Sequence, residues 1–518
     1  MNKKTILPLI ALILLTACGA SNSEPVLRNA PHPDDVAWDD REIFREGLID
    51  AAQPALDQLP GATVYHIELE VPADFGVLQG RERVRYTNRE SAPLDEVYFR
   101  LFPNTAGGAA AVDKVQVDGQ DVEPILEFDD SALRVPLPAA LQPGESVEIQ
   151  MYFGVAVPRV MGGNYGLFGY IDGILVLDEF YPVIPVYDDE GWNVEIPTGT
   201  GDVTHFDASF YLVRVTLPAG LVVVASGVEI GREYEADEQT LTFAAGPARD
   251  FYIAANADYD LVSKRVGGTT INSYAPPGAE DEAKFALRVA RDAIKSFNKR
   301  FGDYPYTEFD VVSTPMTALG MEYPGVVAIT LDCYGASAQG DAFGVVDDSG
   351  EFQGGGFQAA EPLPRGVCES TVAHEVGHQW FYGIVGNDQV DEPWIDESIT
   401  QYVTGLYYRD SHGRAAFRTF LGELDGRWSR VGRDDIPIGL STKAYGGRQY
   451  GAIIYGRGPL FLDTLADEMG QRTFDKFLRD YYQTHKWGIG TGETFRQLAE
   501  QHCQCDLTSL FEEWVYEK

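Results

Sequence analysis

Alternation of apolar and polar residues dominates the chain from about residue 60 to residue 258. Residues 64–71, 83–87 and 212–217 follow this period of two, and clusters of Gly, Pro, Asn and Asp separate such runs. Side chains of a strand point alternately to its two faces, so each run predicts a strand with one buried face. The region therefore predicts an antiparallel β domain without a long helix. His66 and His205 lie in or beside these runs, and we expect both to be surface or packing residues.

The period changes to that of a helix at about residue 279. Apolar residues recur at helical spacing through residues 279–300, with acidic residues early and basic residues late, which suits the helix dipole. Residues 308–312 and 326–330 predict two strands, and residues 367–518 are mostly helical in pattern. The Gly-rich, acidic residues 334–366 predict a long loop, which we expect near the site as a lid.

Together these patterns predict an α+β multidomain protein, with an N-terminal antiparallel β domain followed by a mostly helical domain. A chain of 518 residues is too long for one core. The expected divisions are a signal peptide over 1–17, a tether with a short helix over 18–58, the β domain over 59–258 and a catalytic domain over 259–518.

The mostly helical region 367–518 carries the pattern H-E-x-x-H, which is expected on a helix. Residues four apart share one helix face, so His374 and His378 can both reach one metal ion. Glu397 follows His378 after eighteen intervening residues, within an apolar and acidic pattern that predicts a second helix facing the first. Three protein ligands and one open position are typical of a catalytic zinc site. We therefore expect one Zn²⁺ per chain on His374, His378 and Glu397, with Glu375 holding the water as general base.

Three segments in this part of the chain resemble a known family, the zinc aminopeptidases of aminopeptidase N and leukotriene hydrolase. The run His374–Phe381 reads H-E-V-G-H-Q-W-F, as in the family. The segment 319–323 is similar to the family's G-x-M-E-N but has Leu319 for the first glycine and Tyr323 for the asparagine. Residues 455–458 look like the family's Y-x-K-G with arginine for lysine. Weaker similarity covers most of residues 60–518.

The resemblance implies a fold and a set of roles. It implies a β domain that covers one side of the active site and a thermolysin-like, mostly helical gluzincin peptidase domain. It implies peptide substrates. Glu322 would bind the free α-amine, and Gly320 and Met321 would contact the substrate. It selects Tyr455 as the donor to the oxyanion, with Tyr450 in reserve. A second amine contact from the β domain is left open between Asp178 and Glu179.

Larger members of that family carry a further helical C-terminal domain, which this chain leaves no room for. We therefore expect a more open cleft and a weaker restriction to N-terminal residues.

The formal net charge is −39, from 79 acidic and 40 basic residues. Nucleic acids and anionic lipid surfaces bind basic surfaces, so the charge argues against both as partners.

The first residues have the pattern of an export signal. Lys3 and Lys4 precede a short apolar stretch that ends in Leu15-Thr16-Ala17-Cys18, which looks like a bacterial lipobox. We expect an exported lipoprotein anchored to a membrane by a lipid on Cys18; the alternative is a plain secretory signal. Export permits disulfides among the remaining cysteines, with Cys333 and Cys368 as one possible pair.

Three functions are compatible with these residues. The first is an aminopeptidase that trims peptides outside the cytoplasm. The second is a zinc endopeptidase or another zinc hydrolase, because the G-x-M-E-N segment is substituted. The third is a non-catalytic surface lipoprotein that binds peptides, although such a protein has no need of both a base and an oxyanion donor. Nothing in the sequence indicates the oligomeric state.

Overall fold

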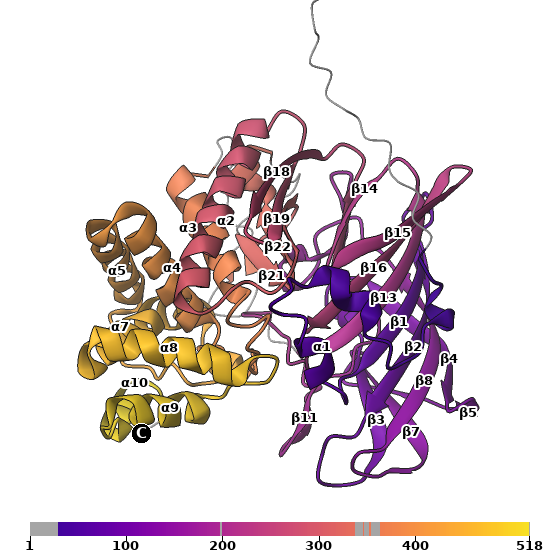
Figure 1. The fold of residues 1–518 in the computed structure, drawn as a ribbon, viewed down its shortest axis with the longest axis horizontal. Coiled ribbons are helices and arrows are strands. Elements are labelled where there is room, and N and C mark those ends of the chain that lie inside the picture. Colours follow the sequence, from indigo (N-terminus) through magenta and orange to yellow (C-terminus); the bar gives the residue numbers. More distant parts are fainter. Residues whose placement is uncertain (1–29, 197–198, 337–344, 347–351, 354–362, 517–518) are drawn as a thin grey trace, which may run out of the picture.

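The computed structural model describes residues 30–196, 199–336, 345–346, 352–353 and 363–516. Strands fill its N-terminal half and helices most of its C-terminal half, and Figure 1 shows the two parts side by side. The expected signal peptide, Cys18, the tether up to residue 29 and most of the expected lid over 334–366 lie outside the described residues.

The N-terminal half is built from three sheets around one apolar core. Its strands are β1 Val64–Glu70, β2 Val77–Thr87, β3 Leu94–Arg100, β4 Ala109–Val117, β5 Gln120–Val122, β6 Ile125–Glu127, β7 Ala132–Leu141, β8 Ser146–Ala156, β9 Phe168–Ile171, β10 Ile174–Leu177, β11 Tyr187–Asp188, β12 Gly191–Trp192, β13 Ser209–Pro218, β14 Val222–Ala225, β15 Val228–Glu235, β16 Glu238–Ala248 and β17 Ile253–Asn256. The largest sheet has the order β15-β16-β13-β1-β2-β8-β4-β5, and the others are β14-β17-β10-β9 and β3-β7-β6. A small separate hairpin joins β11 to β12.

One pairing departs from the antiparallel expectation. Strands β1 and β13 run parallel, with Val64 opposite Phe210, while the other pairings of the large sheet are antiparallel. A parallel pair needs a long crossover connection, and the eleven strands between β1 and β13 supply it. Alternation alone could not reveal this, because it is the same in both kinds of sheet.

The C-terminal half combines a five-stranded sheet with helices. The sheet has the order β18-β19-β20-β22-β21, from β18 Asp260–Val266, β19 Thr269–Ala275, β20 Glu308–Thr314, β21 Gly320–Tyr323 and β22 Val326–Thr330. The helices are α2 Glu280–Arg300, α3 Arg365–His378, α4 Glu397–His412, α5 Arg414–Trp428, α6 Gly447–Ala452, α7 Gly458–Met469, α8 Gln471–His485, α9 Gly492–Cys503 and α10 Thr508–Trp514. A short hairpin, β23 Val345–Val346 with β24 Phe352–Gln353, lies between β22 and α3 in the chain.

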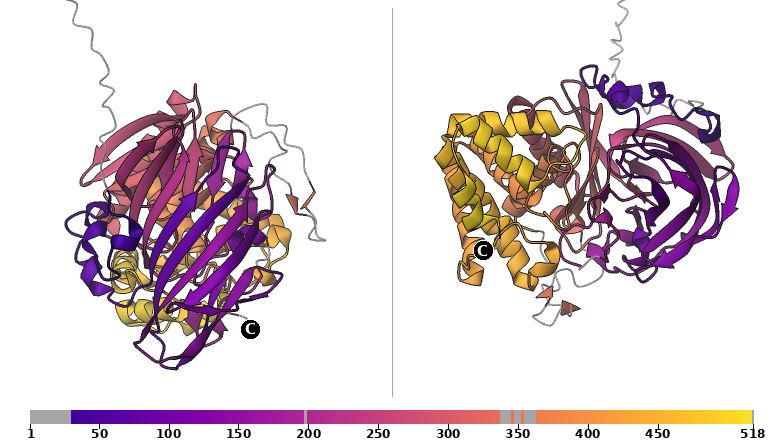
Figure 2. Two further views of the ribbon diagram at one scale, coloured as in Figure 1. Left: turned by 90° about the vertical axis from the view of Figure 1, so that its right-hand side faces the viewer. Right: turned by 90° about the horizontal axis from the view of Figure 1, so that it is seen from below.

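Helix α2 and the strands β20 and β22 confirm the expected elements in this half. The five-stranded sheet separates α2 and α3 from the N-terminal strands, and the two views of Figure 2 show the helices gathered on one side of the molecule. The edge strand β21 pairs only with β22 within this sheet, which leaves its other edge towards the helices that carry the metal motif.

Residues 30–40 are not a free tether. Trp38 stacks on His66 with ring centroids 4.4 Å apart, and Asp34 forms ion pairs with Arg81 at 2.7 Å and with Arg83 at 2.8 Å. This segment falls within the tether expected over 18–58. Its polar, Pro-rich composition gave no sign of these contacts, because they join residues far apart in the sequence. The structure places helix α1 at Ala55–Gln58, within the expected short helical region.

The possible Cys333–Cys368 disulfide is formed, and Cys503 pairs with Cys505. The first bridge ties the 3-10 turn that follows β22, Leu331–Tyr334, to the first turn of α3. Within the described residues, no helix is both long enough and apolar enough to cross a bilayer.

A single buried guanidinium joins the two halves. Arg249, 1% exposed, donates hydrogen bonds to the carbonyl of Phe206 in the β domain and to those of Tyr382, Ile384 and Gly488 in the helical half, over 2.6–3.1 Å. Gly386 leaves the space that this requires, because a Cβ there would lie 2.2 Å from the Arg249 guanidinium carbon.

Replacing Arg249 with an apolar residue should lower the stability of the folded protein. Arg249→Met removes a buried charge and its hydrogen bonds to four carbonyls. Among the described residues, the carbonyls of Phe206 and Tyr382 then have no donor, whereas those of Ile384 and Gly488 keep backbone N–H donors. We expect the free energy of unfolding to fall by about 3–5 kcal/mol. Chemical denaturation followed by circular dichroism measures it. The control is Arg214→Met, which removes a partly exposed ion pair with Glu233 and should cost under about 1 kcal/mol. An equal loss of stability in the two variants would contradict the role of Arg249 in joining the two halves.

Candidate active site

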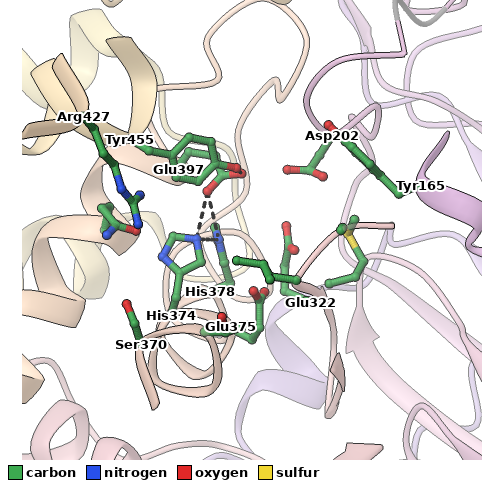
Figure 3. A pocket seen from close by; sticks show the side chains of 16 residues that line it. Tyr165, Asp202, Glu322, Ser370, His374, Glu375, His378, Glu397, Arg427 and Tyr455 are labelled. Carbon is green, nitrogen blue, oxygen red and sulfur yellow. Dashed lines mark hydrogen bonds and ion pairs between the residues drawn. The ribbon is translucent and has the colours of Figure 1, made fainter. Parts of the chain in front are cut away.

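The three expected metal ligands meet between helices α3 and α4. His374 Nε2 lies 3.0 Å from Glu397 Oε2 and 3.1 Å from His378 Nε2, and His378 Nε2 lies 3.3 Å from the same carboxylate oxygen. Figure 3 shows the three side chains converging on one point. All three residues are buried.

The triangle fits a zinc ion. Ligand bonds of about 2.0–2.1 Å in a tetrahedron place ligand atoms roughly 3.3 Å apart, close to the observed separations. His378 Nδ1 lies 3.1 Å from the Phe381 carbonyl, so Nδ1–H donates to that oxygen and Nε2 keeps its lone pair for a metal. Two histidines and one carboxylate leave a fourth position open towards the pocket.

A glycine brings the two helices together. A Cβ on Gly377 of α3 would lie 2.9 Å from the Thr400 methyl group of α4 and 3.3 Å from Val403. Since Gly377 lies directly before His378, the close approach occurs where the ligands from the two helices must meet. The glycine inside the H-E-x-x-H motif is therefore a packing requirement of the metal site.

The expected base, Glu375, lines the same pocket. It is buried, and a Cβ on Gly320 of β21 would lie only 2.4 Å from its Oε1. Burial raises the pKa of Glu375 well above its usual value, and nearby Glu322 raises it further. The structure thus places Gly320 beside the base, where a side chain would displace the carboxylate.

The structure distinguishes between Tyr455 and Tyr450, the two candidates for the oxyanion donor. Tyr455 lies in a π-helical turn, Ile453–Arg457, and its hydroxyl donates to Glu397 Oε1. Its ring centroid is 5.9 Å from that of His374. Tyr450 does not line the pocket that Tyr455 lines. The geometry therefore favours Tyr455, as the motif resemblance implied.

Glu322 lies on the opposite side of the pocket from Tyr455 (Figure 3). Its Oε1 accepts a hydrogen bond from Gln389 Nε2 at 3.1 Å, and the same nitrogen donates to Asp396 at 2.7 Å. Gln389 also accepts from the Thr204 hydroxyl of the β domain. Burial raises the pKa of Glu322, whereas His378 lowers it. One amide side chain thus sets the direction of the Glu322 carboxylate.

Helix α3 also holds the strand that carries Glu322. Gln379, directly after His378, donates from Nε2 to the Tyr323 carbonyl at 2.9 Å and accepts from Gly325 N at 3.0 Å. The Tyr323 ring, which replaces the asparagine of the resembled motif, stacks on Tyr252 at 3.9 Å between centroids. The substitution therefore packs against the β domain and leaves Glu322 in the pocket.

The pocket has a volume of about 230 Å³ and draws residues from both halves. Sequence reasoning missed Tyr165 and Asp202 of the β domain, Arg427 of α5 and the supporting Gln389. Asp202 and Tyr165 come from segments without a periodic pattern. Asp178 and Glu179, the two candidates for a second amine contact, line a smaller chamber next to Glu322 and not the main pocket.

Comparison with known proteins agrees with this site. Residues 363–514 match the family model described as the Peptidase family M1 domain. "Probable aminopeptidase 2" of Sulfurisphaera tokodaii is 24% identical over 319 residues, 60% of this chain and 38% of that protein. "Aminopeptidase N" of Acetobacter pasteurianus is 26% identical over 206 residues, 39% of this chain and 53% of that protein. The chain spans well under two thirds of the length of these relatives.

Solved structures share the fold. The M1 zinc metallopeptidase from Deinococcus radiodurans superposes with a TM-score of 0.62 at 18% identity, covering 91% of this chain and 95% of that one. The fold and the His₂Glu ligand set resemble those of gluzincin metallopeptidases. The match of residues 363–514 to the peptidase M1 domain and the similarity to aminopeptidases support the family that the three motifs indicated.

Loss of one histidine should empty the metal site. His378→Ala removes a ligand and its hydrogen bond to Phe381, so we expect bound zinc to fall from one per chain to less than a tenth. Elemental analysis of the dialysed protein measures it. The control His412→Ala alters a largely exposed histidine on the same pair of helices and should keep the zinc. Full zinc in the His378 variant would place the metal elsewhere.

Proposed function

We propose that the protein is a zinc-dependent aminopeptidase that hydrolyses the N-terminal residue from peptides. One observation carries the proposal. The carboxylate of Glu322, held by Gln389, lies in the same pocket as the metal ligands and the base Glu375. A buried carboxylate at that position forms a charge-assisted hydrogen bond with a free α-ammonium group, which an acylated N-terminus cannot form.

Zinc, when bound to His374, His378 and Glu397, lowers the pKa of a water molecule and polarises the scissile carbonyl. Glu375 accepts the proton of the attacking water and delivers it to the leaving amine. The Tyr455 hydroxyl donates to the oxygen that becomes negatively charged. Glu322 fixes the N-terminus, so the bond presented to the base is the first peptide bond.

The edge strand β21 supports the same orientation. Because β21 pairs only with β22 within its sheet, its free edge can pair with the substrate backbone as an added strand. Gly320 begins β21 and lies against Glu375, so a peptide on this edge passes in front of the base. Met321 lines the pocket between Gly320 and Glu322.

Blocking the N-terminus tests the assignment. We expect the purified full-length, zinc-loaded protein to remove single residues from free peptides and to leave the same peptides intact when their N-termini are acetylated, with products identified by mass spectrometry. Internal cleavage of both forms would identify an endopeptidase instead. Binding of peptides without cleavage would support the non-catalytic alternative.

Two variants connect this activity with the pocket. Glu375→Gln and Tyr455→Phe should each keep zinc and lower kcat by at least about a hundredfold, because each removes a group that acts in the transition state. Steady-state kinetics and elemental analysis on the same samples provide both quantities. Substantial activity in the Glu375 variant would exclude it as the base, and unchanged kcat in Tyr455→Phe would shift the oxyanion role to Tyr450.

We further propose that the protein is exported and anchored by a lipid on Cys18. Support comes from the sequence alone, in which the residues before Cys18 form a lipobox-like pattern. Cys18→Ala should move the protein from the membrane fraction to the soluble fraction of its host, as measured by fractionation and immunoblotting. Retention in the membrane fraction would contradict the lipid anchor.

A further inference from the structure

Two consecutive residues of the β domain face two consecutive residues of the helical half. Thr204 and His205 lie in the irregular segment before β13, and Asp388 and Gln389 lie in the irregular segment between α3 and α4. We call these four residues the interface clamp. Like Arg249, the clamp links the two halves of the molecule, but its contacts also continue into the active site.

A charged contact forms one half of the interface clamp. His205 Nδ1 lies 3.1 Å from Asp388 Oδ2, and the two side chains are 9% and 15% exposed. The other oxygen of this carboxylate, Oδ1, accepts from the backbone N–H of Val390 at 2.9 Å and from that of Asp391 at 2.8 Å. Asp388 therefore shapes the turn that carries Gln389 with one oxygen and holds that turn against the β domain with the other.

The contact with His205 stabilises the ionised form of Asp388. Burial raises the pKa of Asp388, but His205 and the backbone amides of Asp391 and Val390 lower it by more, so it stays below its usual value. The sequence predicted a surface or packing residue at position 205. The structure adds to this a buried ion pair between two residues that lie on opposite sides of the interface.

Hydrogen bonds form the other half of the interface clamp. The Thr204 hydroxyl donates to Gln389 Oε1, and the Thr204 N–H donates to the same oxygen at 3.3 Å. The Gln389 N–H donates in return to the Thr204 carbonyl at 3.4 Å. With its oxygen facing Thr204, the amide of Gln389 presents its nitrogen on the opposite side. This nitrogen donates to Glu322 at 3.1 Å and to Asp396 at 2.7 Å.

Glu322 depends on this orientation of the amide. A reversed amide would place the Gln389 oxygen against the Glu322 carboxylate, and neither group could then donate to the other. Glu322 is 5% exposed, and burial raises its pKa, whereas the hydrogen bond from Gln389 is among the interactions that lower it. Gln389 thus favours the ionised carboxylate, which is the form that attracts an ammonium group.

We propose that His205 and Asp388 are a positioning pair for the amine anchor. Their contact fixes the turn of Gln389, and Gln389 orients Glu322, so the affinity for a substrate amine depends on how the β domain docks. His205 and Asp388 line neither the main pocket nor the smaller chamber beside Glu322, and they act only through Gln389. This inference rests on the proposed aminopeptidase function and adds two positioning residues to the same site.

Two small ligands test the positioning pair by calorimetry on the full-length, zinc-loaded protein. Leucinol carries a free amine, whereas acetohydroxamate binds a metal and has no amine. His205→Phe keeps a ring and removes its nitrogen atoms, so we expect it to weaken leucinol binding about tenfold and to change acetohydroxamate binding by less than about twofold. His205→Asn, whose amide can replace Nδ1, should recover most of the lost affinity. Asp388→Asn removes the charge of the pair and should show the same selective loss.

Two further variants serve as references. Glu322→Gln should weaken leucinol binding at least as much as His205→Phe. Arg89→Gln, which removes an ion pair with Asp207 within the β domain, should leave both affinities unchanged.

Normal leucinol affinity in His205→Phe and Asp388→Asn, together with a loss in Glu322→Gln, would overturn the inference and leave the proposed function standing. Equal losses of both ligands in these two variants would also overturn it, since the pair would then only support the fold. Leucinol binding that is absent from the natural protein, or unaffected by Glu322→Gln, would remove the amine anchor and the inference with it.

Discussion

The close approach of α3 to α4 is the constraint on which the site depends. Gly377 permits it, and His378 and Glu397 come within 3.3 Å as a result. Two hydrogen bonds that position the other site residues also start from this pair of helices. Ser398 of α4 donates to the Ile454 carbonyl at 2.7 Å, which holds the π-helical turn of Tyr455, and Gln379 at the end of α3 holds the turn that follows Glu322. Base, oxyanion donor and amine anchor therefore take their positions from one helix contact.

The buried carboxylates of the pocket form two regions, and each is suited to a different kind of cation. Glu375 and Glu397 lie beside a site suited to a divalent cation, whereas Glu322 and Asp202 lie at the other end of the pocket, where the proposed function places the substrate amine. Carboxylates concentrated in this way are unfavourable in a protein interior without cations. In the proposed function, the binding of a metal and of a cationic N-terminus would both follow from the same buried negative charge.

Much of the fold and the metal ligands could be predicted from local sequence pattern and spacing. Helical spacing placed His374 and His378 on one face. Local pattern located β20 and β22, and within the β domain it located β1, part of β2 and part of β13. Motif resemblance, not pattern, selected Tyr455 and Glu322. Gln389 and Asp202 escaped both approaches, because they lie in irregular segments. Gln389 reaches Glu322 through the folding of the C-terminal half, and Asp202 reaches it only when the two halves dock. Residues 30–40 escaped because ion pairs with distant strands outweigh a composition typical of disorder.

The disulfide between Cys333 and Cys368 closes a covalent ring around the long acidic segment that precedes the metal helix. A protease that cuts this segment once would open the ring but leave the two polypeptides attached. Residues up to 333 would still be bonded to those from 368 onwards, and hence Glu322 to the helix of His374. After such a cut the protein would consist of two disulfide-linked chains, and reduction would remove the covalent link between the fragment with Glu322 and the fragment with His374.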